Sequence, residues 1–260
     1  MKIEVFVATH KSYQMPNEQI YQPLQVGAKL NAKITGYQPD DEGENISSKN
    51  PNFCELTGMY WALANANADY IGLVHYRRYF RSLKKAKSQD KFQMIPDEQE
   101  LADLFKITDI ILPKKQNYYI ETIYSHYSHT HNEEDLRKTR ALIAELSPEY
   151  LASFDKVMSR KKAHMFNMFI MKKTLAKEYG EWLFKILFAL EKEIDLTKYD
   201  TFHARLFGRI SEMLLDVWLD YHGYDYRELP VMYMEKINWP KKIASFLKAK
   251  FFKKKYEGSF

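Results

Sequence analysis

The spacing of apolar residues predicts helices in both halves of the chain. Asn50 and Pro51 make a favourable N-cap and first turn, and the apolar side of a helix then recurs at helical spacing through residues 53–64. The longest such pattern covers residues 175–194, and another covers residues 210–221. Shorter helices are predicted at residues 96–106 and 133–146.

Runs of β-branched and apolar residues predict strands between these helices. The clearest are residues 3–8 and 70–74, and further strands are predicted at residues 32–35, 109–112, 166–171 and 231–234. Strands alternate with helices through the first half of the chain. We therefore predict an α/β fold with a mostly parallel central sheet flanked by helices.

Polar and cationic side chains follow the two clearest strands. In chain order they are Thr9, His10, Lys11, His75, Tyr76, Arg77 and Arg78. Parallel α/β sheets bind ligands at the carboxyl ends of their strands, and arginine binds phosphate oxygens well. We therefore expect a phosphate-bearing ligand here. Since neighbours on an extended chain point to opposite sides, one of the two arginines should face it.

Composition narrows the class of protein. The 260 residues are 45% hydrophobic and 28% charged, a globular balance. The single cysteine, Cys54, excludes an internal disulfide framework and a zinc site made of several thiolates, and it favours the cytoplasm. We find no apolar run of about 20 residues, no signal peptide and no glycine-rich phosphate loop, so a cytoplasmic protein is expected.

The positive charge is concentrated near the C-terminus. Residues 236–256 hold eight lysines and no acid, so the net charge of +5 leaves 5 − 8 = −3 for the rest of the chain. This distribution argues against a nucleic-acid partner, which would require a basic face on the folded domain. Apolar residues recur on one side of the tail, at Ile243, Phe246, Leu247 and Phe251. The pattern favours an anionic membrane surface, with a packed helix as the alternative.

Five segments together resemble a known family. They are residues 44–47, 49–57, 69–80, 166–171 and 209–219. They resemble a bacterial family of capsular and exopolysaccharide biosynthesis proteins, long known only as a domain of unknown function. That family is similar to glycosyltransferases, and some members are linked to transfer of galactofuranose from its UDP donor. The resemblance covers most of residues 1–235.

The resemblance implies a GT-A-like nucleotide-sugar domain at residues 1–235, followed by a basic tail at residues 236–260. In that fold an Asp-x-Asp metal motif follows the strand that corresponds to residues 70–74. Here His75, Tyr76, Arg77 and Arg78 stand in its place. An arginine can neutralise a leaving diphosphate without metal. We therefore expect no metal and no cofactor, with a UDP-sugar as co-substrate.

The remaining site assignments follow from the same resemblance or from position. The donor site is expected to include the residues named above together with Asn45, Ser47 and Lys49. The acceptor site is expected to include His131, Asp135, Asn167 and Arg209. Ordinary loop or packing roles are the alternatives for all of these.

An inverting transferase needs a carboxylate to accept the proton of the acceptor hydroxyl. Glu212 is the candidate base because of the resemblance, and Asp109 at the start of a strand is a rival. Glu212, Asp216 and Asp220 form a helical acidic stripe, and we expect the last two to face solvent.

These observations predict a hexosyltransferase, such as a galactofuranosyltransferase, of capsule or exopolysaccharide biosynthesis. It would transfer sugar from UDP to a lipid-linked oligosaccharide at the inner face of the plasma membrane. The alternatives are a nucleotidyl- or phosphotransferase and a non-catalytic peripheral membrane adaptor. The sequence assigns no oligomeric state.

Overall fold

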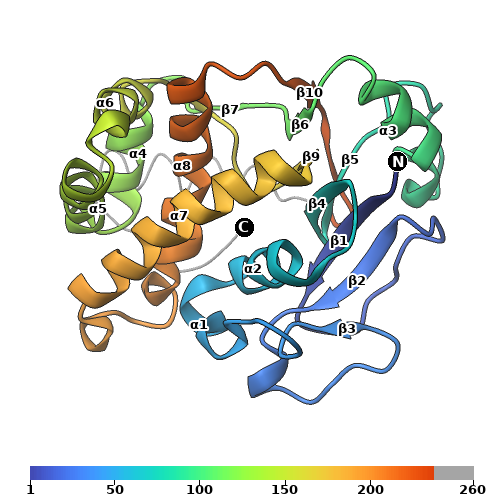
Figure 1. The fold of residues 1–260 in the computed structure, drawn as a ribbon, viewed down its shortest axis with the longest axis horizontal. Coiled ribbons are helices and arrows are strands. Elements are labelled where there is room, and N and C mark those ends of the chain that lie inside the picture. Colours follow the sequence, from blue (N-terminus) through green and yellow to red (C-terminus); the bar gives the residue numbers. More distant parts are fainter. Residues whose placement is uncertain (237–260) are drawn as a thin grey trace. The chain divides into compact units, whose positions relative to one another are not determined.

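The computed structural model describes residues 1–236, which fall into two compact units (Figure 1). Unit 1 comprises Met1–Lys114, Phe166–Glu181 and Asp225–Glu235. Unit 2 comprises Lys115–Met165 and Trp182–Tyr224, together with Lys236. Apart from Lys236, the predicted basic tail lies outside the described residues.

Unit 1 is built on a nine-stranded sheet with the order β10-β6-β9-β4-β1-β2-β3, and β5 joins β4 to β11. The strands are β1 (Ile3–Thr9), β2 (Tyr21–Gln25), β3 (Gln38–Pro39), β4 (Tyr70–His75), β5 (Arg78–Phe80), β6 (Ile110–Pro113), β9 (Phe169–Lys172), β10 (Arg227–Leu229) and β11 (Val231–Tyr233). Strands β3, β2, β1 and β4 are parallel, as are β6 and β10. This mostly parallel sheet confirms the predicted fold class.

Strand β9 is antiparallel to both of its neighbours, β4 and β6. Its amino-terminal end therefore lies at the sheet edge where β1 and β4 end. The loop that precedes β9 is brought to this edge from a distant part of the sequence.

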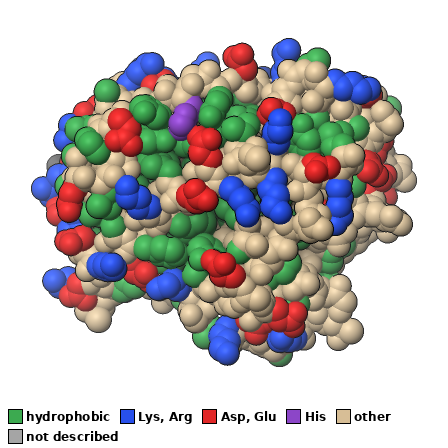
Figure 2. All heavy atoms as spheres, viewed as in Figure 1, with side chains coloured by type: hydrophobic (Ala, Val, Ile, Leu, Met, Phe, Trp, Pro, Cys, Tyr) green, Lys and Arg blue, Asp and Glu red, His purple; other side chains and the backbone are tan. Residues whose placement is uncertain are grey.

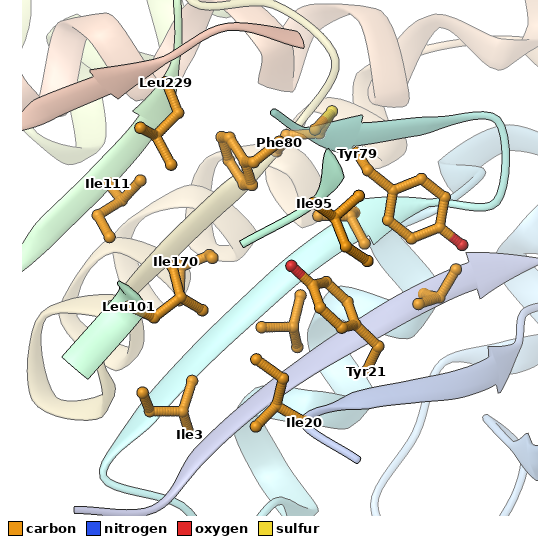
Figure 3. Close-up of a cluster of buried hydrophobic side chains, with 14 of the residues drawn as sticks. Ile3, Ile20, Tyr21, Tyr79, Phe80, Ile95, Leu101, Ile111, Ile170 and Leu229 are labelled. Carbon is orange, nitrogen blue, oxygen red and sulfur yellow. The ribbon is translucent and has the colours of Figure 1, made fainter. Parts of the chain in front are cut away.

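A large apolar cluster packs against one face of the sheet (Figure 3). Ile3, Ile170 and Ile111 come from the strands, and Leu101 comes from α3 (Glu98–Leu104). Gly72 lies in the middle of β4, where an added Cβ would meet the Ile170 side chain at 2.9 Å. The absence of a side chain at Gly72 lets the central strands pack closely.

Helix α2 (Leu56–Asn65) covers strands β1 and β2. The Trp61 ring meets Phe6 edge-on at 5.7 Å, and an added Cβ at Gly58 would lie 2.9 Å from Leu24. Helix α7 (Lys173–Glu193) packs on α2 in turn, since Gly180 accommodates the Leu63 side chain. These helices bury apolar surface, the dominant stabilising contribution to folding.

The helix predicted after Asn50 is interrupted. It consists of α1 (Asn50–Phe53) and α2, separated by Cys54, whose φ is 53° and ψ is −131°. Asn50 lies inside α1 and is not its N-cap. The Asn50 side-chain amide instead donates to the Cys54 carbonyl at 2.8 Å and supports the break.

The strand predicted at residues 32–35 is also wrong. The Gln25 side chain satisfies the Ala32 carbonyl at 2.8 Å and the Ile34 N–H at 2.7 Å, so these groups do not join a strand ladder. The strand at this side of the sheet is β2. It was not predicted from the sequence because it contains Pro23, and proline is uncommon in strands.

Unit 2 is mainly helical. Its elements are β7 (Gln116–Asn117), α4 (Ile123–Thr130), α5 (Glu133–Leu146), α6 (Leu151–Met158), β8 (Lys162–Ala163), the C-terminal part of α7, and α8 (Leu206–His222). Helices α6 and α8 pack together, and Trp218 is fully buried. Among the described residues, no helix has both the length and the hydropathy needed to cross a membrane.

The prediction that Asp216 faces solvent is wrong. Asp216 is only 2% exposed and accepts hydrogen bonds from His164, at 2.7 Å from Nδ1 and 2.8 Å from the backbone N–H. Burial raises the pKa of Asp216, but the His164 hydrogen bonds and the Lys115 charge outweigh it and the pKa is lowered. Asp220 is only partly exposed and forms ion pairs with Lys156 and Arg160.

Candidate functional site

The predicted phosphate-binding segments meet at one edge of the unit 1 sheet. Strands β1 and β4 are adjacent and parallel, with Ala8 opposite His75, so both segments leave the sheet at the same edge. The buried Tyr76 ring lies between them. His10 and Tyr13 meet it edge-on at 5.5 and 4.9 Å, and the Lys11 ammonium lies 5.4 Å from its centre. The structure therefore brings His10, Lys11 and Tyr76 together.

The two arginines have different neighbours. Arg77 is partly exposed, stacks on Tyr76 at 5.2 Å and lies 3.6 Å from the Glu235 carboxylate. The half-buried Arg78 guanidinium lies 4.6 Å from the Phe166 ring and 5.9 Å from the Tyr233 ring.

The Arg78 Nε is buried and has no hydrogen-bond partner among the described residues. A buried donor of this kind is rare in folded proteins. An anionic ligand would supply the missing acceptor, which makes Arg78 the stronger phosphate-binding candidate of the pair.

His75 ties β4 to the loop before β9. Its Nε2 lies 2.5 Å from the Phe166 carbonyl oxygen, to which it donates. Burial lowers the pKa of His75, and the Arg78 and Arg77 charges lower it further, whereas Glu55 acts in the opposite direction. His75 is therefore neutral at neutral pH, and its ring positions Phe166 beside Arg78.

Strained backbone is concentrated at the same place. Phe166 and Asn167 have φ values of 80° and 51°, in the left-handed region that non-glycine residues rarely adopt. The Asn167 amide donates to Glu55 Oε1 at 2.7 Å, and Glu55 directly follows the strained Cys54. Such strain is concentrated at functional sites.

Glu55 was not predicted as a site residue, because the sequence indicated an uninterrupted helix through residues 53–64 and Glu55 lies outside its apolar pattern. Phe166 and Tyr233, which flank the Arg78 guanidinium, were also missed. No local signal identifies these three residues. The antiparallel placement of β9 and β11 brings Phe166 and Tyr233 to the site, and the break between α1 and α2 presents Glu55.

The other predicted donor residues form bonds within their own loops. Thr9 is buried and donates to the Lys11 carbonyl at 2.7 Å. Ser47 is buried and donates to Asp40, which also accepts from two backbone N–H groups. Asn45 donates to the Gly43 carbonyl at 2.8 Å, and the Lys49 ammonium lies 5.9 Å from the Phe53 ring.

Asp109 lies at the opposite end of the sheet. It precedes β6, accepts from the Tyr70 hydroxyl at 3.0 Å and lies 3.3 Å from the Lys172 ammonium. Tyr70 begins β4, whereas His75 ends it. This position removes Asp109 as a base for chemistry at the carboxyl edge.

Three of the predicted acceptor residues are neighbours in unit 2. Buried Asp135 accepts from the hydroxyls of Tyr127 at 3.1 Å and Tyr199 at 2.5 Å. Burial and then Asp135 raise the pKa of Tyr199 to about 12. The Tyr127 ring also contacts His131, and the Phe202 ring contacts both His131 and Arg209. These contacts group Asp135, His131 and Arg209.

Glu212 is half-buried on α8, one turn after Arg209. It therefore belongs to unit 2, together with the grouped acceptor candidates. Asn167 belongs to unit 1.

The residues after β4 do not fit a divalent cation. Carboxylates would be the appropriate ligands for Mg²⁺ or Mn²⁺, but this turn presents two guanidinium groups. Among the described residues, no cluster of three or more His, Cys, Asp or Glu side chains is arranged to hold a metal ion.

The mixed α/β sheet of unit 1 and its cationic carboxyl edge define an α/β protein with a candidate phosphate-binding edge. The model of a family described as a domain of unknown function (DUF4422) matches residues 4–223, and the chain belongs to that family. The match confirms the family resemblance seen in the sequence.

Among solved structures, the apo form of the bifunctional glycosyltransferase WbbM is similar, with a TM-score of 0.83 and 30% sequence identity. The match covers 91% of this chain and 46% of that chain. This likeness shows that the α/β fold is of the glycosyltransferase type. The protein spans about half the length of WbbM. Comparison with curated proteins gives no match.

Proposed function

We propose that the protein is a glycosyltransferase that moves a hexosyl group, such as galactofuranosyl, from a UDP-sugar to a lipid-linked oligosaccharide of capsule or exopolysaccharide assembly. The observation that carries the proposal is the likeness to the glycosyltransferase WbbM over 91% of this chain. The cationic carboxyl edge of the sheet supports a donor with a diphosphate group.

In this proposal Arg78 contacts the diphosphate. As the bond between the sugar C1 and the diphosphate oxygen breaks, UDP leaves with the electron pair and gains negative charge. A guanidinium group held between Phe166 and Tyr233 is already oriented to stabilise that charge. The reaction would then need no metal ion, and the sugar C1 would be inverted by the incoming acceptor oxygen.

Acceptor binding stays a proposal for His131, Asp135 and Arg209, and separately for Asn167. The family resemblance offers Glu212 as one candidate for the base. Nucleotide binding stays a proposal for five further residues, which are His10, Lys11, Asn45, Ser47 and Lys49. Of these, Ser47 is buried, Lys49 is partly exposed and the other three are exposed.

A lipid-linked acceptor would place the enzyme at the inner face of the plasma membrane, where the basic tail would contact anionic lipid. On the face drawn in Figure 2, acidic and basic side chains of the described residues are interspersed with apolar ones. That face therefore presents no uniformly basic surface of the kind that a nucleic-acid partner would require.

The test is a turnover assay with a panel of UDP-sugars and a soluble acceptor, with and without a chelator. We expect release of UDP that is unaffected by chelation and retained after deletion of residues 237–260. Loss of turnover on chelation and its return with manganese would overturn the metal-free mechanism. Absence of turnover with every donor would support the adaptor instead.

A further inference from the structure

We propose that Glu55 is the base that accepts the proton of the acceptor hydroxyl. This assignment deepens the proposed function and rests on it. In the step, the acceptor oxygen forms its bond to the sugar C1, the C1–oxygen bond to UDP breaks, and the hydroxyl proton passes to a Glu55 carboxylate oxygen. UDP carries away the electron pair, so the step needs no further reactant.

The first argument is the connection between Glu55 and the proposed phosphate site. Arg78 packs against the Phe166 ring at 4.6 Å, and Asn167 is the next residue along the chain. The Asn167 amide donates to Glu55 Oε1 at 2.7 Å. The Glu55 charge also acts on His75, whose ring donates to the Phe166 carbonyl. The Phe166–Asn167 loop therefore contacts both the Arg78 guanidinium group and the Glu55 carboxylate.

The second argument is the way in which Glu55 is held. Glu55 begins the turn into α2 directly after Cys54, and its partner Asn167 has a φ of 51°. Both sides of the Glu55–Asn167 hydrogen bond thus depend on backbone conformations that cost of order 1–3 kcal/mol each. Such conformations persist only where the surrounding structure holds them in place. The same surroundings therefore hold the Glu55 carboxylate in one position.

The third argument is that one carboxylate oxygen is engaged and the other is available. Oε1 accepts from Asn167, whereas Oε2 has no hydrogen bond within residues 1–236, and the side chain is partly exposed. A base needs one oxygen within reach of the hydroxyl and a second group to orient it. Asn167 is then a positioning residue.

The test compares Glu55→Gln with Glu212→Gln and with Glu98→Gln, an exposed control. Glutamine has the same shape and still accepts from Asn167, so folding and UDP binding should persist. We expect kcat of Glu55→Gln to fall about 10²- to 10⁴-fold with little change in KM. The acid limb of the pH–rate profile should disappear in this variant. Asn167→Gly, which tolerates the left-handed backbone, should lower kcat less.

Retention of at least half of the wild-type kcat in Glu55→Gln would overturn the assignment, and a matching loss in Glu212→Gln would move the base to α8. If Glu55→Gln fails to fold, an unchanged kcat in Asn167→Gly would overturn the assignment. If the wild-type chain shows turnover, the proposed function stands whatever the result for the Glu55 and Asn167 variants. Absence of wild-type turnover would overturn both.

Discussion

At the scale of the residue, two arginines that are adjacent in the sequence have different roles because different side chains surround them. Arg77 lies beside a carboxylate, Glu235, which offsets its charge. Arg78 is enclosed by two aromatic rings, and its Nε lacks a partner within the described part of the chain. Alternation along the chain predicted that the two would differ, but the neighbours that distinguish them follow from the tertiary structure.

The lowered pKa of the partly buried His75 predicts a pH dependence of stability. Burial lowers its pKa in the folded protein below the ordinary 6.5, so the unfolded chain binds more protons between the two pKa values. Stability should therefore rise with pH up to about 6.5. His75→Gln, which can still donate to the Phe166 carbonyl, should reduce this dependence.

The measurement is the melting temperature between pH 5 and pH 7.5 for the wild-type chain, for His75→Gln and for the exposed control His10→Gln. We expect a shallower slope in His75→Gln alone. An equal slope in all three proteins would contradict the neutral, buried state of His75.

The hydrogen-bond partners of individual polar residues are the feature that the sequence predicts least well. Asp216 belongs to a regular acidic stripe, yet it is buried against His164, which lies 52 positions away. A helical pattern gives the side on which a residue lies and does not reveal a polar partner elsewhere in the chain. The same limit applies to Glu55 and Asn167.

At the scale of the element, patterns with strong periodicity predicted the structure well. Helix α5 has the predicted bounds of 133–146, and β1 and β4 each extend one residue beyond prediction. In these elements the spacing of apolar residues and the residues that mark the ends of the element indicate the same bounds. Short elements such as β2 and α6 were missed because their patterns are too brief to distinguish from loops.

The break between α1 and α2 predicts an unusual response to mutation. Cys54 has a φ of 53° and ψ of −131°, a conformation that glycine adopts with little strain. Cys54→Gly should therefore be more stable than Cys54→Ala, by about 1 kcal/mol. In an ordinary helix the order is reversed, since alanine is favoured over glycine by a similar amount.

Urea unfolding of the two variants gives the comparison. Ala64→Gly, at an uninterrupted position of α2, should show the ordinary cost of glycine in a helix. Greater stability of Cys54→Ala than of Cys54→Gly would contradict the strained break.

At the scale of the whole molecule, the parallel topology explains why part of the site was predictable. Two strands that end in polar residues were expected to bring them to one edge, and β1 and β4 do so. The other half of the site comes from the Phe166–Asn167 loop, Glu55 and Tyr233. The loop reaches the site because β9 is antiparallel to its neighbours, Tyr233 reaches it on β11, and Glu55 reaches it at the break before α2. No local sequence pattern predicts these three features.

The central claim is that the carboxyl edge of the unit 1 sheet binds the donor diphosphate through Arg78 without metal. The most direct measurement is the melting temperature of the wild-type chain, Arg78→Ala and Arg77→Ala with UDP and a chelator. Ligand at 100 times Kd stabilises a folded protein by about 2.7 kcal/mol. The account predicts that UDP raises the melting temperature of the wild-type chain, that Arg78→Ala loses the increase and that Arg77→Ala loses less. No increase in the wild-type chain, with or without manganese, would contradict it.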